Sequence, residues 1–351
     1  MESRQQQLPK AACFFSNCMK QRLIFGLSAL IALALVFFVV SRFRDRNDKG
    51  PTAQLPPAAQ KENVWMAPDT VLIPHTTEGE LIRYGRSLIA NTAYYFGPTG
   101  KINHRWNGMN CQNCHLDAGT KPWGNNYGGV YSTYPKFRER RGALENVFQR
   151  INDCIQRSLN GVALDSNSHE MQAILAYMKW LGKAVPRGKK PAGSGILQLV
   201  FLKRAADSAK GALVYNVKCQ RCHGLEGQGM FKPDSVSYLY PPLWGKCSYT
   251  TAAGLYRLSR FAGYVKDNMP FGASHKAAQV TDEEAWDVAA FVNSMPRPAK
   301  IFRKDWPDVS LKPFDHPYGP FLDSFSLQQH KYGPYGSIQK AKENLSAKRK
   351  T

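Results

Sequence analysis

"GMNCQNCHLDAG", residues 108–119, holds a Cys-x-x-Cys-His string, and "VKCQRCHGLEGQG", residues 217–229, holds a second one. Such a string can serve a redox dithiol, half of a zinc site or the attachment of haem c. A dithiol needs no histidine after it, and zinc needs further ligands at short, regular spacing. Haem c uses every member, because both thiols form thioethers and the histidine ligates the iron. The sequence therefore predicts two covalently attached haem c groups, held by Cys111, Cys114, His115, Cys219, Cys222 and His223.

Helical patterns flank both strings in the same order. Apolar residues recur at helical spacing in residues 77–97, 169–185, 202–219 and 281–295. Thr281 and Glu284 form a capping-box pattern at the start of the last of these helices. Helix, haem string, loops and closing helix is the order of a cytochrome c fold. We therefore expect a mainly α fold, with two tandem cytochrome c-type domains after an N-terminal transmembrane helix.

The expected transmembrane helix is the apolar run "LIFGLSALIALALVFFVV", residues 23–40. It is long enough to nearly span the hydrocarbon layer of a bilayer. The sequence "VVSRFRDR" at its end offers no small-x-small cleavage site, so we expect an uncleaved anchor. Basic residues flank the run on both sides and do not fix its orientation. Because haem c is attached outside the bacterial cytoplasmic membrane, we expect an inner-membrane protein with its catalytic domains in the periplasm.

These features predict a division of the chain into seven parts. They are a cytoplasmic N-terminus (1–22), the anchor (23–41), a periplasmic linker (42–68), a catalytic haem c domain (69–184), an interdomain linker (185–197), an electron-transfer haem c domain (198–298) and an extended basic C-terminal tail (299–351). The net charge of +21 suits a membrane surface, an acidic redox partner or an anionic substrate. Nucleic acid is not expected as a partner, because no recognition motif is present.

The distal ligand decides whether a haem transfers electrons or does chemistry. In the second domain, Met269 precedes a proline on a loop before the last helix. The alternative role, a methionine of the hydrophobic core, suits Met295 better. We expect Met269 to ligate the iron of an electron-transfer haem.

The first domain lacks such a Met-Pro pair and has Cys154 in the corresponding stretch, "FQRINDCIQRSLNG". A thiolate there would be a strongly donating ligand that lowers the haem potential and places a nucleophilic sulfur at the iron. Three alternatives stay open: a buried structural cysteine, a disulfide between Cys154 and Cys247, or a distal His104 or His169. Cys154 as the distal ligand is favoured among them.

Arginines surround Cys154 in the sequence, at Arg138, Arg140, Arg141, Arg150 and Arg157. Arg150 precedes Cys154 by four residues, which is one helical turn. Guanidinium groups favour a nearby thiolate and bind small oxyanions with paired hydrogen bonds. A solvated basic face would explain any single arginine, but the cluster predicts an anion pocket. Its candidate catalytic residues are Cys154, Arg138, Arg140 and Arg150.

Together these motifs resemble those of one family. "CQNCHLDAGT", "STYPKFRERRG", "RINDCIQRSLNG", "CQRCHGLEGQG", "PPLWG" and "NMPFG" are similar to the dihaem c-type thiosulfate dehydrogenases that form tetrathionate, which are related to the dihaem sulfur-oxidising cytochromes. The resemblance covers about residues 80–296. It implies a catalytic haem ligated by His115 and Cys154, and an electron-relay haem ligated by His223 and Met269.

The resemblance also implies an activity: two thiosulfate anions are coupled to tetrathionate, and two electrons pass to a small c-type cytochrome or another respiratory-chain acceptor. A tetrathionate reductase that uses the same site is one alternative. A non-catalytic, membrane-tethered dihaem electron carrier is the alternative from another class. Cys154 separates enzyme from carrier, because a carrier has no use for a thiolate in an arginine-lined pocket.

Overall fold

The computed structural model describes residues 64–233 and 235–348, and these described residues belong to one compact unit. Within the described ranges, no helix is long and apolar enough to cross a membrane. The longest described helices have 14 residues in the first haem domain and 13 in the second, whereas a membrane span needs about 20. The expected fold class is therefore wrong in its transmembrane helix, although the described chain is mainly helical. The expected anchor, residues 23–41, lies outside the described residues.

The first haem domain contains eight helical segments, two of which are single 3-10 turns, and one short hairpin. In chain order these elements are η1 (Thr70–Leu72), α2 (Thr77–Ala90), α3 (Thr92–Phe96), η2 (Cys111–Asn113), α4 (Leu116–Gly119), α5 (Val130–Thr133), β1 (Lys136–Arg138), β2 (Ala143–Glu145), α6 (Val147–Arg157) and α7 (His169–Gly182). The strands β1 and β2 pair antiparallel. The long helices α2 and α7 carry most of the buried apolar side chains and pack on each other, and α2 also contacts the haem loop at η2 and α4.

The second haem domain repeats this order. Its elements are α8 (Ser208–Lys218), α9 (Gln220–His223), β3 (Met230–Phe231), β4 (Tyr238–Tyr240), η3 (Gly254–Tyr256), α10 (Leu258–Asn268) and α11 (Asp282–Ser294). As predicted, Thr281 and Glu284 form a capping box at the start of α11. The Thr281 side chain accepts a hydrogen bond of 3.1 Å from the Glu284 amide, and the Glu284 carboxylate accepts one of 2.8 Å from the Thr281 amide. Both amides would otherwise lack a partner within the helix.

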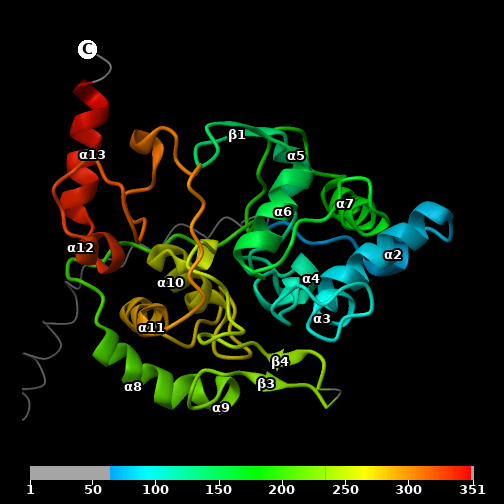
Figure 1. Ribbon diagram of the computed structural model, residues 1–351, viewed down its shortest axis with the longest axis horizontal. Helices are drawn as coiled ribbons and strands as arrows, with labels where there is room; N and C mark the ends of the chain where they lie inside the picture. The colour runs from blue at the N-terminus through cyan, green and yellow to red at the C-terminus, as the bar shows by residue number, and fades with distance from the viewer. Residues whose placement is uncertain (1–63, 234, 349–351) are drawn as a thin grey trace, which may run out of the picture. The chain divides into compact units, whose positions relative to one another are not determined.

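Each domain is built on one close crossing of its first and last long helices, α2 on α7 and α8 on α11 (Figure 1). A Cβ atom at Gly85 would lie 1.9 Å from the carbonyl oxygen of Ala173, and one at Gly211 would lie 1.9 Å from that of Asp287. No side chain fits at such a distance, so glycine is required at both crossings. The same backbone contact thus recurs in both halves of the chain.

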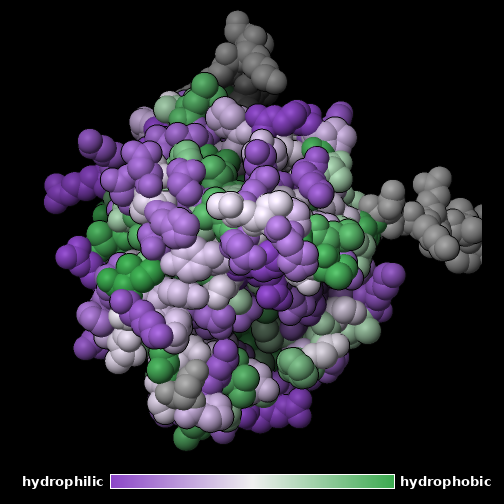
Figure 2. All heavy atoms as spheres, turned by 90° about the vertical axis from the view of Figure 1, so that its right-hand side faces the viewer, coloured by the Kyte–Doolittle hydropathy of each residue, from purple (hydrophilic) through white to green (hydrophobic). Residues whose placement is uncertain are grey.

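Two hydrophobic cores surround these crossings. The first includes Ile82, Leu88, Met171 and Tyr177, with Cys111 and Cys114 packed at its edge. The second includes Tyr215, Leu258 and Trp286, with Cys219 and Met269 at its edge. The predicted haem-binding side chains therefore lie where apolar packing meets the surface. The face of the molecule shown in Figure 2 is largely polar, with its apolar residues in separate patches.

The residues after α11 differ from the extended tail expected from the sequence. They include η4 (Val309–Leu311), α12 (Leu327–Tyr332) and α13 (Gly336–Lys348). Tyr335 and Ile338 are buried in the second core, and Asp315 is buried in contact with Arg257 and Ser259. In Figure 1, the orange segment that follows α11 passes close to the turn after β1. The tail is therefore packed on the haem domains through specific contacts.

Candidate active site

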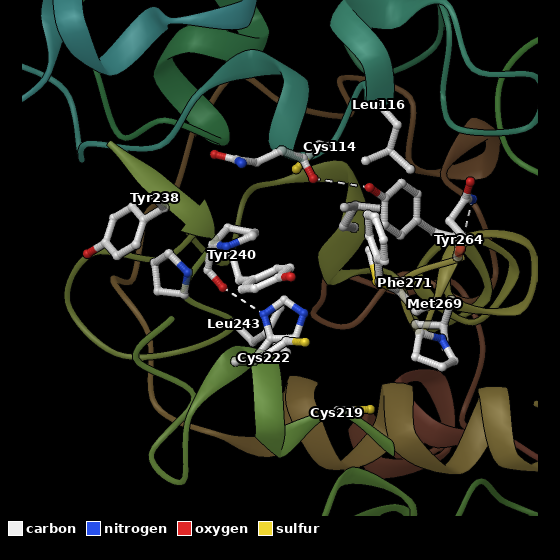
Figure 3. A pocket seen from close by; sticks show the side chains of 18 of the residues that line it. Cys114, Leu116, Cys219, Cys222, Tyr238, Tyr240, Leu243, Tyr264, Met269 and Phe271 are labelled. Atoms are coloured by element: carbon white, nitrogen blue, oxygen red, sulfur yellow. Dashed lines mark hydrogen bonds between the residues drawn. The ribbon is translucent and has the colours of Figure 1, made fainter. Parts of the chain in front are cut away.

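A cavity of about 770 Å³ lies at the second Cys-x-x-Cys-His string. Cys219, Cys222, His223 and Met269 all line it, and most of the remaining lining is apolar. Figure 3 shows Cys219, Cys222 and Met269 around this cavity, with Cys114 and Leu116 reaching it from the first domain. The structure thus brings together all four residues that the sequence assigns to the second haem.

A hydrogen bond at Nδ1 orients the ring of His223 so that its other nitrogen, Nε2, can bind a metal. This nitrogen lies 2.9 Å from the carbonyl oxygen of Pro241, and since a carbonyl can only accept, Nδ1 carries the proton. Burial lowers the pKa of His223, so the ring stays neutral. Its Nε2 lone pair is then free to act as a ligand. Met269 follows directly after α10, whose C-terminus places it on the cavity wall.

The first haem string has the same histidine geometry. His115 Nδ1 lies 2.5 Å from the carbonyl oxygen of Asn125, and burial lowers the pKa of His115 to about 4. The Tyr127 ring stacks on this imidazole with 4.5 Å between ring centroids. His115 is therefore also a neutral, oriented imidazole with Nε2 available.

The residues of both strings fit haem c. Burial raises the pKa of Cys111 to about 11 and that of Cys114 to about 12, which suits thiols that are consumed in thioether bonds and not kept as free nucleophiles. Each string supplies two thiols and one oriented imidazole at the edge of an apolar core. The four cysteines are free to form these bonds, since none of them is in a disulfide.

Cys154 lies on α6, close to the first haem string. A thiolate at Cys154 would raise the pKa values of both Cys111 and Cys114, so the three sulfurs are within electrostatic range of one another. Cys154 and Cys247 are both free cysteines, and Cys247 is exposed, so the structure contains no disulfide between them. Of the described cysteines outside the two strings, only Cys154 is near the first haem site.

The two histidines considered as alternative distal ligands are on the surface. His104 and His169 are both exposed. The His169 ring stacks on Tyr84, with 5.1 Å between centroids, at the start of α7. The geometry therefore favours Cys154 over either histidine as the residue that would hold the first haem on its distal side.

Arg150 is the arginine most closely associated with Cys154. Both residues lie on α6, which begins with a capping box formed by Asn146 and Gln149. The negative charge of a Cys154 thiolate raises the pKa of Arg150, and this is the largest effect on that group. Arg150 also lowers the pKa of His115. Its guanidinium is therefore near both candidate ligands of the first haem.

The other arginines differ in whether a carboxylate balances their charge. Arg138 and Arg141, at the β1–β2 hairpin, lie 3.7 and 3.5 Å from the buried carboxylate of Glu145. Arg157 pairs with Asp153 at 3.6 Å and with Asp305 at 2.7 Å. Within the described ranges, Arg140 and Arg150 have no carboxylate within 4.0 Å. Of the three arginines predicted to be catalytic, these two thus lack a direct ion pair with a carboxylate.

Two features of the site have no signal in the local sequence. The Tyr264 hydroxyl, on α10, donates to the carbonyl oxygen of Asn113 at 3.0 Å, so the first haem loop forms part of the second cavity wall. Asp305 and Trp306 come from the C-terminal segment and contact Arg157 and Arg140. Both features join residues far apart in the chain, and no motif marks their partners.

Two domains, each with a cysteine pair, an oriented histidine and a cytochrome c helix crossing, define a dihaem c-type cytochrome. Residues 103–186 match the family model "SoxA/TsdA, cytochrome c domain", and residues 208–296 match "Cytochrome c". The chain is similar to thiosulfate dehydrogenases from Allochromatium vinosum (40% identity, 66% of this chain, 83% of the relative) and Stutzerimonas stutzeri (32% identity, 78% of this chain, 85% of the relative). It belongs to the thiosulfate dehydrogenase family, as its motifs predict, and carries two covalently bound c-type haems.

A solved structure supports the same relationship. The thiosulfate dehydrogenase TsdBA from Marichromatium purpuratum, in its as-isolated form, superposes with a TM-score of 0.60 at 29% identity. The superposition covers 66% of this chain and 49% of that one, so this chain spans about half the length of the solved protein.

Proposed function

We propose that this protein oxidises two thiosulfate anions to one tetrathionate anion and two electrons, in the periplasm. One sulfur–sulfur bond forms between the terminal sulfurs of the two anions, and no proton is taken up or released. The observation that carries the proposal is the placement of Cys154 and Arg150 on one helix beside the first haem string. Family membership supports the same substrate, since the relatives are thiosulfate dehydrogenases.

The main barrier to this reaction is the repulsion between two dianions. Positive charge that is already in place, and is poorly solvated, reduces such a barrier most. Arg140 and Arg150 meet both conditions, because each is partly buried and neither has a carboxylate within 4.0 Å among the described residues. We assign these two side chains to the sulfonate oxygens of thiosulfate. Arg138 lies beside them but shares its charge with Glu145.

Cys154 would meet the terminal sulfur of the substrate. Its position one turn from Arg150 lets one guanidinium face both the sulfur of Cys154 and a bound anion. When bound, the two haems accept the two electrons and deliver them to a small c-type cytochrome or another respiratory-chain acceptor. The chain supports this relay by placing Cys114 on the wall of the second cavity, with Tyr264 hydrogen-bonded to the neighbouring Asn113.

The test is turnover of the purified holoprotein with thiosulfate and an artificial acceptor such as ferricyanide. We expect one tetrathionate for every two thiosulfate anions and two ferricyanide ions consumed, together with thiosulfate-dependent reduction of the haem absorption bands. Tetrathionate with a reduced dye, on the same sample, measures the reverse direction. Haem bands that do not respond to either anion would reject the proposal and leave the electron-carrier alternative.

A further inference from the structure

The C-terminal segment, residues 302–306, lies against the arginines of the candidate anion site. This segment follows residue 296, where the match to the cytochrome c family ends. Its contacts are made by Phe302, Asp305 and Trp306, which reach Arg157 and Arg140 across the fold. Because the segment is outside the haem domains, neither haem motif explains these contacts.

Asp305 holds Arg157 with both of its oxygens. The two hydrogen bonds, from Arg157 Nη1 and Nη2, are each 2.7 Å long. The Arg157 guanidinium also lies over the Phe302 ring, 3.9 Å from its centroid. Arg157 is 6% exposed, so these contacts enclose it almost completely. Asp153 adds a second carboxylate at 3.6 Å from Nε, and the charge of Arg157 is thereby balanced within the protein.

Trp306 holds Arg140 from the other side. The Trp306 amide donates to the Arg140 carbonyl oxygen at 2.8 Å, and the guanidinium lies 5.5 Å from the centroid of the Trp306 ring. Arg140 Nε is buried and has no hydrogen-bond partner within the described part of the chain. After burial, the charges of Arg157 and Arg150 are the next causes that lower the pKa of Arg140, to about 10. The three guanidiniums are thus close enough to repel one another.

We propose that Asp305 and Trp306 are positioning residues of the anion site. The carboxylate of Asp305 pairs with Arg157 and reduces the effect of its charge on a bound anion. The ring of Trp306 holds the guanidinium of Arg140 at the site. Thiosulfate then meets chiefly the guanidiniums of Arg140 and Arg150, because Arg157 is paired with Asp305 and Arg138 shares its charge with Glu145. This sets the positive charge at a level that binds a dianionic substrate and still releases the dianionic product. The inference rests on the proposed function, because it names the residues that tune its substrate site.

The two residues act in opposite directions, which makes the inference testable. Asp305→Asn keeps the shape of the side chain and one acceptor for Arg157, but adds one net positive charge. We expect the KM for thiosulfate to fall about 3- to 10-fold, a range set by the attraction of one added charge for a dianion at partly screened distance. Inhibition by tetrathionate should strengthen by a similar factor. Trp306→Ala should raise the KM by about 3- to 10-fold, since Arg140 loses the ring that holds it, and Trp306→Phe should restore most of the loss.

A matched control separates the local effect from the change in net charge. Glu343→Gln makes the same charge change on an exposed position of α13 and should leave the KM within about 2-fold of wild type. Both site variants should retain two haems, which the absorption spectrum reports. Changes in KM of the same sign for Asp305→Asn and Trp306→Ala, or changes in kcat alone, would show that the segment only supports the fold.

Sulfate binding tests the inference without turnover. Calorimetric titration of the oxidised holoprotein with sulfate, a dianion that cannot be coupled, should give tighter binding for Asp305→Asn and weaker binding for Trp306→Ala. Unchanged sulfate affinity in both variants would overturn the inference. If wild type binds sulfate with these shifts in its variants and yet does not oxidise thiosulfate, the proposed function fails and the anion site stands.

Discussion

Arg150 and Cys154 lie one turn apart on α6, and a thiolate at Cys154 raises the pKa of Arg150. Arg150 therefore remains cationic at neutral pH. A guanidinium of this kind can balance the sulfur of Cys154 and one sulfonate group together. The relationship joins the substrate site to the first haem site through a single helix.

Replacement of Arg150 tests its role in binding the anion. Arg150→Gln should lower kcat/KM for thiosulfate by about 100-fold or more, because a preorganised donor is lost where charge must be balanced. Arg150→Lys should recover only part of the loss, because an ammonium cannot form the paired hydrogen bonds of a guanidinium. Steady-state kinetics measure both. Arg83→Gln, which removes an arginine paired with Glu80 on α2, is the control and should retain wild-type kinetics.

Met269→Gly tests the assignment of the second haem. Loss of a thioether ligand should lower the potential of that haem, since methionine ligation raises it. A redox titration of the holoprotein measures the shift, and transfer to the acceptor should slow more than reduction by thiosulfate. Met295→Leu, a conservative change at a methionine packed against the second core, is the control. Equal potentials of the second haem in wild type and Met269→Gly would show that Met269 is not its ligand.

The helix crossings predict that replacing a glycine by alanine destabilises the protein at a crossing and not at an open position. Gly85→Ala places a Cβ 1.9 Å from the Ala173 carbonyl oxygen and should destabilise the protein by about 1–3 kcal/mol through overpacking. Gly254→Ala meets no atom within 4 Å and should change stability by less than about 0.5 kcal/mol. Denaturant unfolding of the holoprotein, followed by circular dichroism, measures both. Equal stability of the two variants would show that α2 and α7 do not cross as described.

Buried His316, in the C-terminal segment, predicts that the stability of the protein depends on pH. Burial lowers the pKa of His316 to about 3, and the nearby charge of Lys312 acts in the same direction. The unfolded chain takes up a proton below about pH 6.5 while the folded one does not, so stability falls as the pH drops from 6.5 toward 3. His316→Gln should reduce this loss by about 1–2 kcal/mol at pH 5. Unfolding measured at pH 7 and 5 tests it, and the exposed His104→Gln should leave the pH slope unchanged.

Local patterns in the sequence predict much of this fold. The capping box at Thr281 and the helical turn that joins Arg150 to Cys154 are interactions within four residues, and the helical period makes them visible. The two Cys-x-x-Cys-His strings predict the cofactors for the same reason, because each string holds both thiols and the proximal histidine within five residues. Apolar periodicity also marks the four long helices that cross in pairs.

Local sequence patterns do not reveal contacts between residues that are far apart in the chain. Asp305 and Arg157 are 148 residues apart, and nothing near either residue indicates the other. The β1–β2 hairpin has strands of three residues, too short for an alternating pattern. Residues 299–348 are rich in proline and aromatic residues without a helical period before α12, so the sequence alone suggests an extended tail. An apolar run such as residues 23–40 shows suitability for a membrane but does not itself establish a span.

We assign to Cys154 the sulfur that distinguishes an enzyme from an electron carrier. The most direct measurement compares Cys154→Gly with Cys247→Gly, an exposed free cysteine, for the absorption spectrum and for thiosulfate turnover. Cys154→Gly should keep both covalent haems, change the spectrum of the first, raise its potential and lose nearly all turnover, because a strongly donating thiolate is gone. Cys247→Gly should match wild type in all four respects. A Cys154→Gly protein with unchanged spectrum and full turnover would show that Cys154 neither ligates the first haem nor contacts the substrate.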